Sequence, residues 1–485
     1  MRKYFLGNHR YMSYFGLTAL FLLFCAEMKY ASPYAATWDQ VDFALALDRY
    51  DLLAMQPHFP GYPYFILGGM LVHAFVENPA KALSIFNVLM LWSASIPMFL
   101  LAKKYGATEM AWLVTVLVQS ASYVVLIGSQ PMSEGAALSV LWWYVWAVEQ
   151  ARERKTWQAH LLSLILFGLL LGIRLSYVPF AIALAFLWYE DWKQHRSIRR
   201  LFGLVAAALA FQLIWVMGIA QTEGSLYGFL KLAFSFTNGH FQEWGGTVSN
   251  DQQPLWQRIG RFLFYNIIWI GISSRTMILL VLYLFVFIWA FYSTRAFPFP
   301  RWLFAAIVAY GVWALFAQNI DKPRHVIPLV HFALFYGWLR YFYRNTSTYK
   351  RLLALIVMIA QIMIGTLYIR EQALHLPATY QLAYDLQKKD EPFVLYTWEE
   401  ARVLQYLRAD FPYQEALRFS FFLQHQANYT HAKIYVTDHV VKGFQAQGVS
   451  LDRRLRKVKT YRSNTLADPI YGEITLYEWM NSTME

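Results

Sequence analysis

Long stretches without a charged residue dominate the pattern of hydrophobic and polar positions along the chain. A helix needs roughly 20 mostly apolar residues to cross about 30 Å of membrane hydrocarbon. Stretches near this length occur at 11–26, 82–102, 110–133, 156–173, 201–222, 276–294, 302–320 and 352–369. Three shorter ones, 135–148, 175–189 and 326–339, also cross if their flanking charges reach toward water. The pattern predicts an all-α polytopic membrane protein with about eleven transmembrane helices.

The last part of the chain, 370–485, follows a different pattern. Strand-like runs at 393–398, 433–437 and 472–479 alternate with helix-like runs at 399–410 and 438–446. This alternation indicates a small α/β domain. We therefore expect a transmembrane domain over 1–369, followed by a C-terminal α/β domain over 370–485.

Composition and charge agree with a membrane protein and suggest its orientation. Hydrophobic residues make up 58% of the chain and charged residues 15%, whereas soluble domains average about 45–50% and about 25%. If the N-terminus is cytoplasmic, the inner segments (1–10, 103–109, 149–155, 190–200, 295–301 and 340–351) hold 18 Lys and Arg against 5 Asp and Glu. The outer segments hold 10 against 11. Because cytoplasmic loops are rich in Lys and Arg, the net charge of +12 marks orientation and predicts no nucleic-acid partner. The N-terminus is expected in the cytoplasm, and the C-terminal domain outside the plasma membrane.

The first outer loop, 27–81, gathers acidic residues and a rigid proline-rich turn. Asp39 and Asp42 lie in a stretch, 38–54, whose apolar spacing predicts an amphipathic interfacial helix. The segment 57-PHFPGYP-63 contains His58 and Tyr62, and the uncharged 59–76 is expected to be a re-entrant or interfacial helix. Asp39 lies beside Trp38, an interface anchor. If partly desolvated there, its carboxylate has a raised pKa and suits a general base. The alternative is a solvated loop face.

Three other outer segments carry isolated or clustered charges. Glu134 is the sole charge in 128-GSQPMSEG-135, and Arg174 is a lone cation where two helices meet. The segment 319-NIDKPRHVIPL-329 adds Lys322, Arg324 and His325. Arginine presents a planar fork to phosphate oxygens. The alternatives are a solvated loop tip, a lipid headgroup contact and a helix-capping basic loop. Carboxylates with phosphate-binding cations suit transfer of a group from a phosphate-linked lipid, because the lipid phosphate leaves as a stable anion.

These features together resemble a known family. The acidic first outer loop with Asp39, the turn 60-PGYPYF-65, the second acidic loop with Glu134 and the late 324-RHVIPL-329 are similar to the GT-C superfamily of membrane glycosyltransferases. The closest similarity is to bacterial dolichyl-phosphate-mannose-protein mannosyltransferase-like and aminoarabinose transferase-like proteins. The stretch 393-FVLYTWEEARVLQYL-407 is similar to the end of such chains.

The resemblance implies a function and a set of site residues. It implies an inverting glycosyltransferase that moves a sugar from a polyprenyl-phosphate-linked donor to an acceptor hydroxyl of a glycan, lipid or protein at the outer face of the membrane. By the resemblance, Asp39 and Glu134 are the acidic residues of catalysis and Arg324 contacts the donor phosphate. We further expect Arg174, Lys322 and His325 to take part in phosphate binding, and Asp42, His58 and Tyr62 to have secondary roles.

Other functions and a metal requirement stay open from the sequence. A transporter or flippase of lipid-linked saccharides is the alternative, although the ionisable residues lie at loop edges and no internal repeat is visible. A non-catalytic scaffold is a third function. We expect no cofactor: Asp39, Asp42 and Glu134 offer oxygens to a divalent ion, but close relatives do not all need one.

Overall fold

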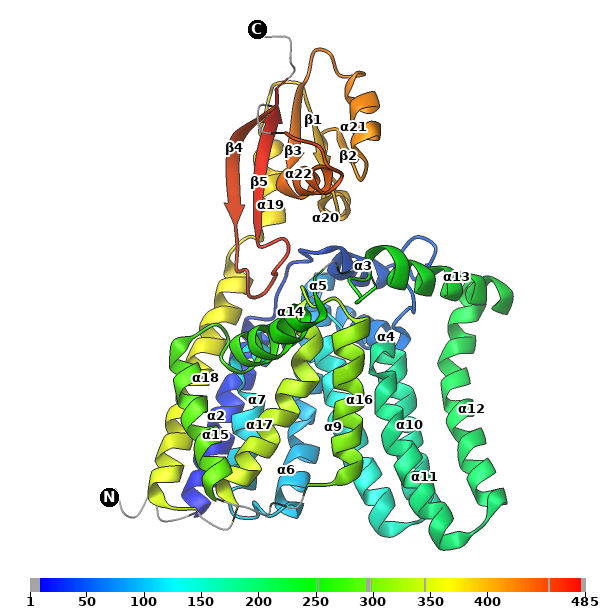
Figure 1. Ribbon diagram of the computed structural model, residues 1–485, viewed down its shortest axis with the longest axis vertical. Coiled ribbons are helices and arrows are strands. Elements are labelled where there is room, and N and C mark those ends of the chain that lie inside the picture. Colours follow the sequence, from blue (N-terminus) through cyan, green and yellow to red (C-terminus); the bar gives the residue numbers. More distant parts are fainter. Residues whose placement is uncertain are drawn as a thin grey trace.

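The computed structural model describes residues 9–249, 251, 253–293, 297, 299–343, 346–451 and 454–480. The basic residues Arg2, Lys3, Arg295 and Arg344, which contribute to the predicted orientation, lie outside this part. A helical bundle is followed by an α/β domain at one end of it, and α2 begins at the opposite end (Figure 1). The bundle is built from α2 (His9–Lys29), α3 (Trp38–Ala46), α4 (Pro63–His73), α5 (Pro79–Ser93), α6 (Ser95–Lys104), α7 (Ala111–Gln119), α8 (Ser122–Gly128), α9 (Glu134–Arg154), α10 (Trp157–Ile173), η1 (Leu175–Ala181), α11 (Ile182–His195), α12 (Ile198–Thr222), α13 (Leu226–Gly239), η2 (His240–Trp244), α14 (Leu255–Gly260), η3 (Arg261–Ile272), α15 (Met277–Ser293), α16 (Arg301–Ala317), η4 (Pro323–Val326), α17 (Ile327–Phe342) and α18 (Thr348–Leu374).

Judged by helix length and composition, fewer helices can cross a membrane than the sequence pattern predicts. Among the described residues, four helices or runs of adjoining helices are long and apolar enough to cross a membrane, or up to six if each of two bent helix pairs is one span. The four are Tyr11–Lys29, Pro79–Lys104, Ile198–Thr222 and Thr348–Leu386. α10 and α16 are also apolar, but each has only 17 residues. The prediction of about eleven spans is therefore not confirmed.

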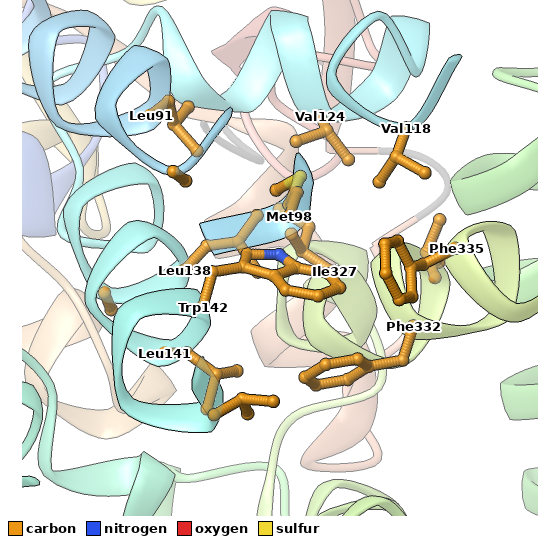
Figure 2. Close-up of a cluster of buried hydrophobic side chains, with 14 of the residues drawn as sticks. Leu91, Met98, Val118, Val124, Leu138, Leu141, Trp142, Ile327, Phe332 and Phe335 are labelled. Carbon is orange, nitrogen blue, oxygen red and sulfur yellow. The ribbon is translucent and has the colours of Figure 1, made fainter. Parts of the chain in front are cut away.

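Aromatic and aliphatic side chains from six helices form the centre of the bundle (Figure 2). Trp142 of α9 is fully buried, and its ring lies 4.8 Å from those of Phe332 and Phe335 on α17. The indole Nε1 donates to Nδ1 of His331 at 3.0 Å, which satisfies the one polar atom of this ring. The packing joins α5–α9 to α17, whose first residues follow the basic segment at 322–325.

The stretch 110–133, predicted as one span, is broken. α7 and α8 meet at an angle of 61°. The break is stabilised by Gln361 of α18, whose Nε2 donates to the carbonyl of Leu117 at 3.0 Å and to Ser120 Oγ at 2.6 Å. Irregular backbone at membrane depth needs such partners, because hydrocarbon offers none.

The C-terminal domain is a five-stranded mixed sheet with helices on both faces. Its elements are α19 (Ala378–Leu386), β1 (Phe393–Thr397), α20 (Glu400–Tyr406), β2 (Tyr413–Glu415), α21 (Phe419–Gln426), β3 (Lys433–Thr437), α22 (Asp438–Ala446), β4 (Leu455–Arg462) and β5 (Glu473–Trp479). The strand order is β2-β1-β3-β5-β4. β1 is parallel to β2 and β3, whereas β5 is antiparallel to β3 and β4. The three strand-like runs of the sequence are β1, β3 and β5, and the sequence pattern does not predict β2 or β4.

The first outer loop differs from its sequence-based description. α3 ends at Ala46 instead of reaching residue 54, and Asp51 Oδ1 accepts the backbone N–H of Ala54 at 3.0 Å in a turn beyond it. α3 also has little free surface, because it packs against α5 on one side and α20 of the C-terminal domain on the other. α4 has 11 residues, a length of about 16 Å, and is too short to cross the membrane, as expected for this segment.

Candidate active site

Four segments far apart in the sequence bring their charged residues to one point below the C-terminal domain. Asp39 lies in the first turn of α3, after the N-cap Thr37, whose side chain accepts the N–H of Gln40. Glu134 is the first residue of α9. A carboxylate at either position is stabilised by the helix dipole. Arg174 follows the last residue of α10, and η4 with the residue before it supplies the remaining charges.

Arg324 lies between the two carboxylates. Its Nη2 is 2.5 Å from Asp39 Oδ2, and its Nε is 2.9 Å from Glu134 Oε1. Lys322 Nζ is 3.9 Å from the same Asp39 oxygen. Arg174 Nη2 is 3.1 Å from Glu134 Oε1. The Glu134 side chain is 1% exposed, so its charge is compensated by two guanidinium groups and not by water.

His325 belongs to this cluster as a neutral hydrogen-bond acceptor. Arg174 Nη2 lies 3.1 Å from His325 Nδ1. Because a guanidinium only donates, that nitrogen accepts and carries no proton. Burial lowers the pKa of His325 well below its usual range, and the nearby Arg174, Arg324 and Lys322 lower it further. His325 thus helps to orient Arg174, together with Ser133, whose Oγ accepts from Arg174 Nη1 at 2.8 Å.

The pKa of Asp39 is shifted in the direction opposite to the expected one. Burial by itself raises it, as the sequence suggests, but Lys322 and Arg324 outweigh burial and hold the pKa of Asp39 far below its usual range. The prediction of a raised pKa is therefore wrong. The lowered pKa results from tertiary structure, because both cations come from a segment nearly 300 residues away in the sequence.

Asp42, His58 and Tyr62 form a second, adjoining network. His58 Nδ1 is 3.1 Å from Asp42 Oδ2, and His58 Nε2 is 3.0 Å from the Tyr62 hydroxyl. The other oxygen of Asp42 accepts from Arg402 Nε of α20 at 2.8 Å. Asp42 is fully buried. Its arginine partner is Arg402 of the C-terminal domain and not one of the phosphate-binding candidates.

The turn before α4 requires the glycine of 60-PGYP-63. Gly61 has φ +93°, and a Cβ there would lie 2.3 Å from the Tyr50 hydroxyl. That hydroxyl donates to the Gly61 carbonyl at 3.0 Å. The tight turn aims Tyr62 at His58 and thereby places it beside the charged cluster.

A pocket between the bundle and the C-terminal domain opens onto the cluster. Its bundle side has Asp39, Lys322 and Arg324, and its other side comes from the C-terminal domain. We call it the interdomain pocket; it is lined by Thr37, Trp38, Asp39, Lys322, Arg324, Glu399, Asp468, Pro469, Ile470 and Tyr471. Sequence reasoning missed the C-terminal residues and Arg402. The segment between β4 and β5, ten residues at 463–472, is long for a hairpin loop, which usually has about 2–5, but the sequence pattern does not predict β4 and therefore gave no such signal.

The described residues contain no group of three or more His, Cys, Asp or Glu side chains arranged to hold a metal ion. Asp39 and Glu134 are paired with Arg324, and Asp42 is paired with Arg402. The absence of a metal stays a prediction.

Comparison with known proteins finds similarity in structure alone. No protein-family model matches the chain, and no curated protein matches it in sequence. ArnT from Cupriavidus metallidurans, solved bound to undecaprenyl phosphate, superposes with a TM-score of 0.55 at 10% identity, covering 96% of this chain and 98% of that one. Its apo structure gives 0.53 at 10% identity, covering 95% and 97%.

The chain has the GT-C fold. An archaeal oligosaccharyltransferase, from Archaeoglobus fulgidus and tethered to an acceptor peptide, superposes with a TM-score of 0.46 at 11% identity, covering 87% of this chain and 69% of that one. The fold assignment rests on the two ArnT structures. It confirms the GT-C resemblance over nearly the whole chain, and the apolar helices agree with a membrane protein.

Proposed function

We propose that this GT-C protein is a glycosyltransferase. It moves a sugar from a polyprenyl-phosphate-linked donor to an acceptor hydroxyl of a glycan, lipid or protein, at the outer face of the plasma membrane. The observation that carries the proposal is the position of Arg324, whose guanidinium lies between Asp39 and Glu134 at the edge of an open pocket. ArnT, which shares the fold, was solved with undecaprenyl phosphate.

The charge of the cluster suits a lipid-linked phosphate. Arg174, Lys322 and Arg324 are cationic, Asp39 and Glu134 are anionic, and His325 is neutral. The bundle side of the pocket therefore carries one more positive than negative charge, whereas Glu399 and Asp468 line the side that belongs to the C-terminal domain. A phosphodiester carries one negative charge, which suits the bundle side, and the fork of Arg324 matches phosphate oxygens. These cations stabilise the departing phosphate, so we propose that the reaction needs no metal.

Asp39 is the proposed base, and donor binding makes it basic enough. In the unliganded site Lys322 and Arg324 keep its pKa low. A phosphate that binds the same two cations competes for their charge, and the pKa of Asp39 then rises. Asp39 takes the proton of the acceptor hydroxyl, the acceptor oxygen bonds to the anomeric carbon, and the phosphate leaves with the electrons of the broken C–O bond. A single displacement of this kind inverts the anomeric carbon.

For Glu134 we propose a positioning role in place of the catalytic role expected from the sequence. It is almost fully buried and paired with two arginines, so it has little access to an acceptor. We propose that it holds Arg174 and Arg324 in the orientation that binds phosphate, which makes it a positioning residue.

Sugar transfer from undecaprenyl-phosphate-linked sugars, measured in membranes that contain the full chain, tests the proposal. Asp39→Asn is expected to lower transfer by about 10²–10⁴-fold, because it removes the base and keeps the shape. Asp48→Asn, an exposed carboxylate of the same loop, is the matched control and keeps wild-type transfer. Equal transfer by Asp39→Asn and wild type would contradict the assigned base. Movement of the lipid-linked sugar across the membrane without transfer would favour the flippase.

A further inference from the structure

The loop between β4 and β5, residues Ser463–Gly472, reaches from the C-terminal domain onto the bundle (Figure 1). Leu466 is 4% exposed and belongs to the same hydrophobic cluster as the bundle helices. Gln130 Nε2, four residues before Glu134, donates to the Ala467 carbonyl at 3.1 Å. Asn464 Nδ2 donates to Glu371 Oε2 at 2.9 Å. The loop is therefore anchored beside the charged cluster.

The loop is also held from its own domain. His439 Nε2 lies 3.1 Å from the Ile470 carbonyl, and Nδ1 of the same ring is 2.5 Å from the buried Glu400. The Tyr471 hydroxyl donates to Glu399. Gly472 closes the turn, since a Cβ there would lie 2.5 Å from the Asp468 carbonyl oxygen. These contacts fix the segment 468–471, which forms the far side of the interdomain pocket.

The carboxylate of Asp468 uses one oxygen to hold the loop. Its Oδ1 accepts the backbone N–H groups of Ile470 and Tyr471 at 3.2 and 3.0 Å. Its Oδ2 accepts no hydrogen bond from the described residues, and Asp468 lines the pocket. Burial raises the pKa of Asp468 to about 6, although the two N–H groups, Arg324 and Lys322 lower it. A half-buried carboxylate thus lines the pocket that also holds the phosphate-binding cations.

The other wall residues offer what a sugar ring needs. Trp38 has a buried indole Nε1 without an acceptor among the described residues, and Tyr471 adds a second aromatic ring. Hydroxyl groups bind to carboxylates and indole N–H groups, while apolar sugar faces stack on aromatic rings. In a polyprenyl-phosphate-linked donor, the sugar is bonded directly to the phosphate. A phosphate on Arg324 and Lys322 therefore places the sugar in this pocket.

We propose that Asp468, together with Trp38, forms the subsite for the sugar of the donor, so that the C-terminal domain takes a direct part in substrate binding. This inference rests on the proposed function. Asp468 accepts hydrogen bonds from the sugar hydroxyls through Oδ2, and Oδ1 keeps the loop in its turn. The proton-accepting role stays with Asp39.

Binding of two kinds of probe to the purified full chain separates the sugar subsite from the phosphate site. The probes are undecaprenyl phosphate without a sugar, and undecaprenyl phosphate carrying mannose, glucose or aminoarabinose, of which the one that wild type binds best is used. Asp468→Asn is expected to weaken binding of the sugar-bearing lipid by about tenfold or more, since a charged acceptor is lost. Binding of sugar-free undecaprenyl phosphate stays unchanged, whereas Arg324→Gln weakens both.

Two further variants separate loss of the free carboxylate oxygen from disruption of the loop. Asparagine still accepts the two loop N–H groups, and Asp468→Ser, which also forms such turns, is a second variant without the free oxygen. Glu473→Gln replaces an exposed carboxylate just after the loop and should bind both probes like wild type. Equal binding of the sugar-bearing lipid by Asp468→Asn and wild type overturns the inference, as does parallel weakening of both probes. Unchanged donor binding with a raised KM for the acceptor overturns it too, because the subsite then belongs to the acceptor. If wild type binds none of these lipids, the proposed function itself fails.

Discussion

Arg324 is the residue on which the charges of the site depend. It links Asp39, which is one-quarter exposed, to the fully buried Glu134. A buried ion costs several kcal/mol to desolvate, so such a group persists only when a counter-charge and hydrogen bonds compensate it. Here each of these two carboxylates has a guanidinium neighbour, and Lys322 and Arg324 also line the pocket. In the proposed function, an anionic ligand pairs with these two cations.

A second buried pair, His439 and Glu400, predicts how stability depends on pH. The two side chains are 2.5 Å apart, and Glu400 raises the pKa of His439 to about 9 from an ordinary 6.5, although burial opposes the shift. Since the folded state favours the protonated ring, this stabilisation is complete below about pH 6.5 and is lost as the pH rises to about 9. His439→Gln is expected to lower the free energy of unfolding by roughly 3 kcal/mol at pH 6.

Thermal denaturation of the full chain between pH 6 and pH 10 measures this effect. The difference in Tm between wild type and His439→Gln should shrink as the pH passes 9. His431→Gln, a change in the turn that precedes β3, is the control and should follow the wild-type curve. Two curves that stay parallel over the whole range would show that the pair contributes nothing to stability.

At the scale of elements, helix ends build the site. The N-terminal turns of α3 and α9 carry the carboxylates, and the C-terminal end of α10 carries Arg174. The remaining cations are Arg324 in η4 and Lys322 just before it. Side chains at helix ends project beyond the apolar bundle, where pairing with a substrate at the membrane surface becomes feasible. α3 lies between the bundle and α20, so its position depends on both parts of the protein.

The ion pair between α3 and α20 predicts how strongly the two parts are coupled. Arg402 is 2.8 Å from Asp42, and its Nη2 donates to the carbonyls of Ala54 and Met55. Arg402→Gln leaves Asp42 buried with His58 as its remaining partner, at an expected cost of about 3–5 kcal/mol. Hydrogen exchange should rise over residues 38–46. Arg408→Gln, an exposed change beyond the end of α20, is expected to leave exchange there unchanged. Unaltered exchange in Arg402→Gln would mean that apolar contacts alone hold the domain in place.

For the whole molecule, the central feature is the position of the C-terminal domain over the bundle end at which the charged cluster lies (Figure 1). Its β4–β5 loop closes the pocket from above, while the bundle supplies the cations from below. In the proposed function, the lipid donor approaches from the membrane side and the acceptor from the other. The division of the chain into two parts therefore has a chemical consequence, because neither part lines the pocket alone.

The orientation in the membrane that the distribution of Lys and Arg predicts is directly testable. In a Cys25→Ser background, which removes the one native thiol, Ser420→Cys of the C-terminal domain should react with a membrane-impermeant maleimide in right-side-out vesicles. Arg154→Cys, at the end of α9, should react only after permeabilisation, because cytoplasmic loops are the basic ones. Both positions are exposed. Labelling in the reverse order would show that the proposed orientation is wrong.

Several features were predictable from the sequence, because they depend on local pattern. Charge-free stretches indicated apolar helices, alternation indicated β1, β3 and β5, and the loop edges carried Asp39, Glu134, Arg174 and Arg324. The GT-C resemblance followed from the same residues. The break between α7 and α8 was not predictable, because the side chain that stabilises it, Gln361, comes from α18.

The sequence by itself determined which segments are apolar, which charges lie at their ends, and which fold family they resemble. Hydrophobic burial and helix or strand periodicity act over neighbouring residues and can be read along the chain. Only the tertiary structure decided the partners: Arg324 with Asp39 and Glu134, Arg402 with Asp42, and Asp468 opposite Lys322 and Arg324. The two residues of each pair are more than 100 positions apart in the sequence. Their electrostatic interactions depend on distance and burial, which is also why the pKa of Asp39 is lowered where sequence context predicted a rise.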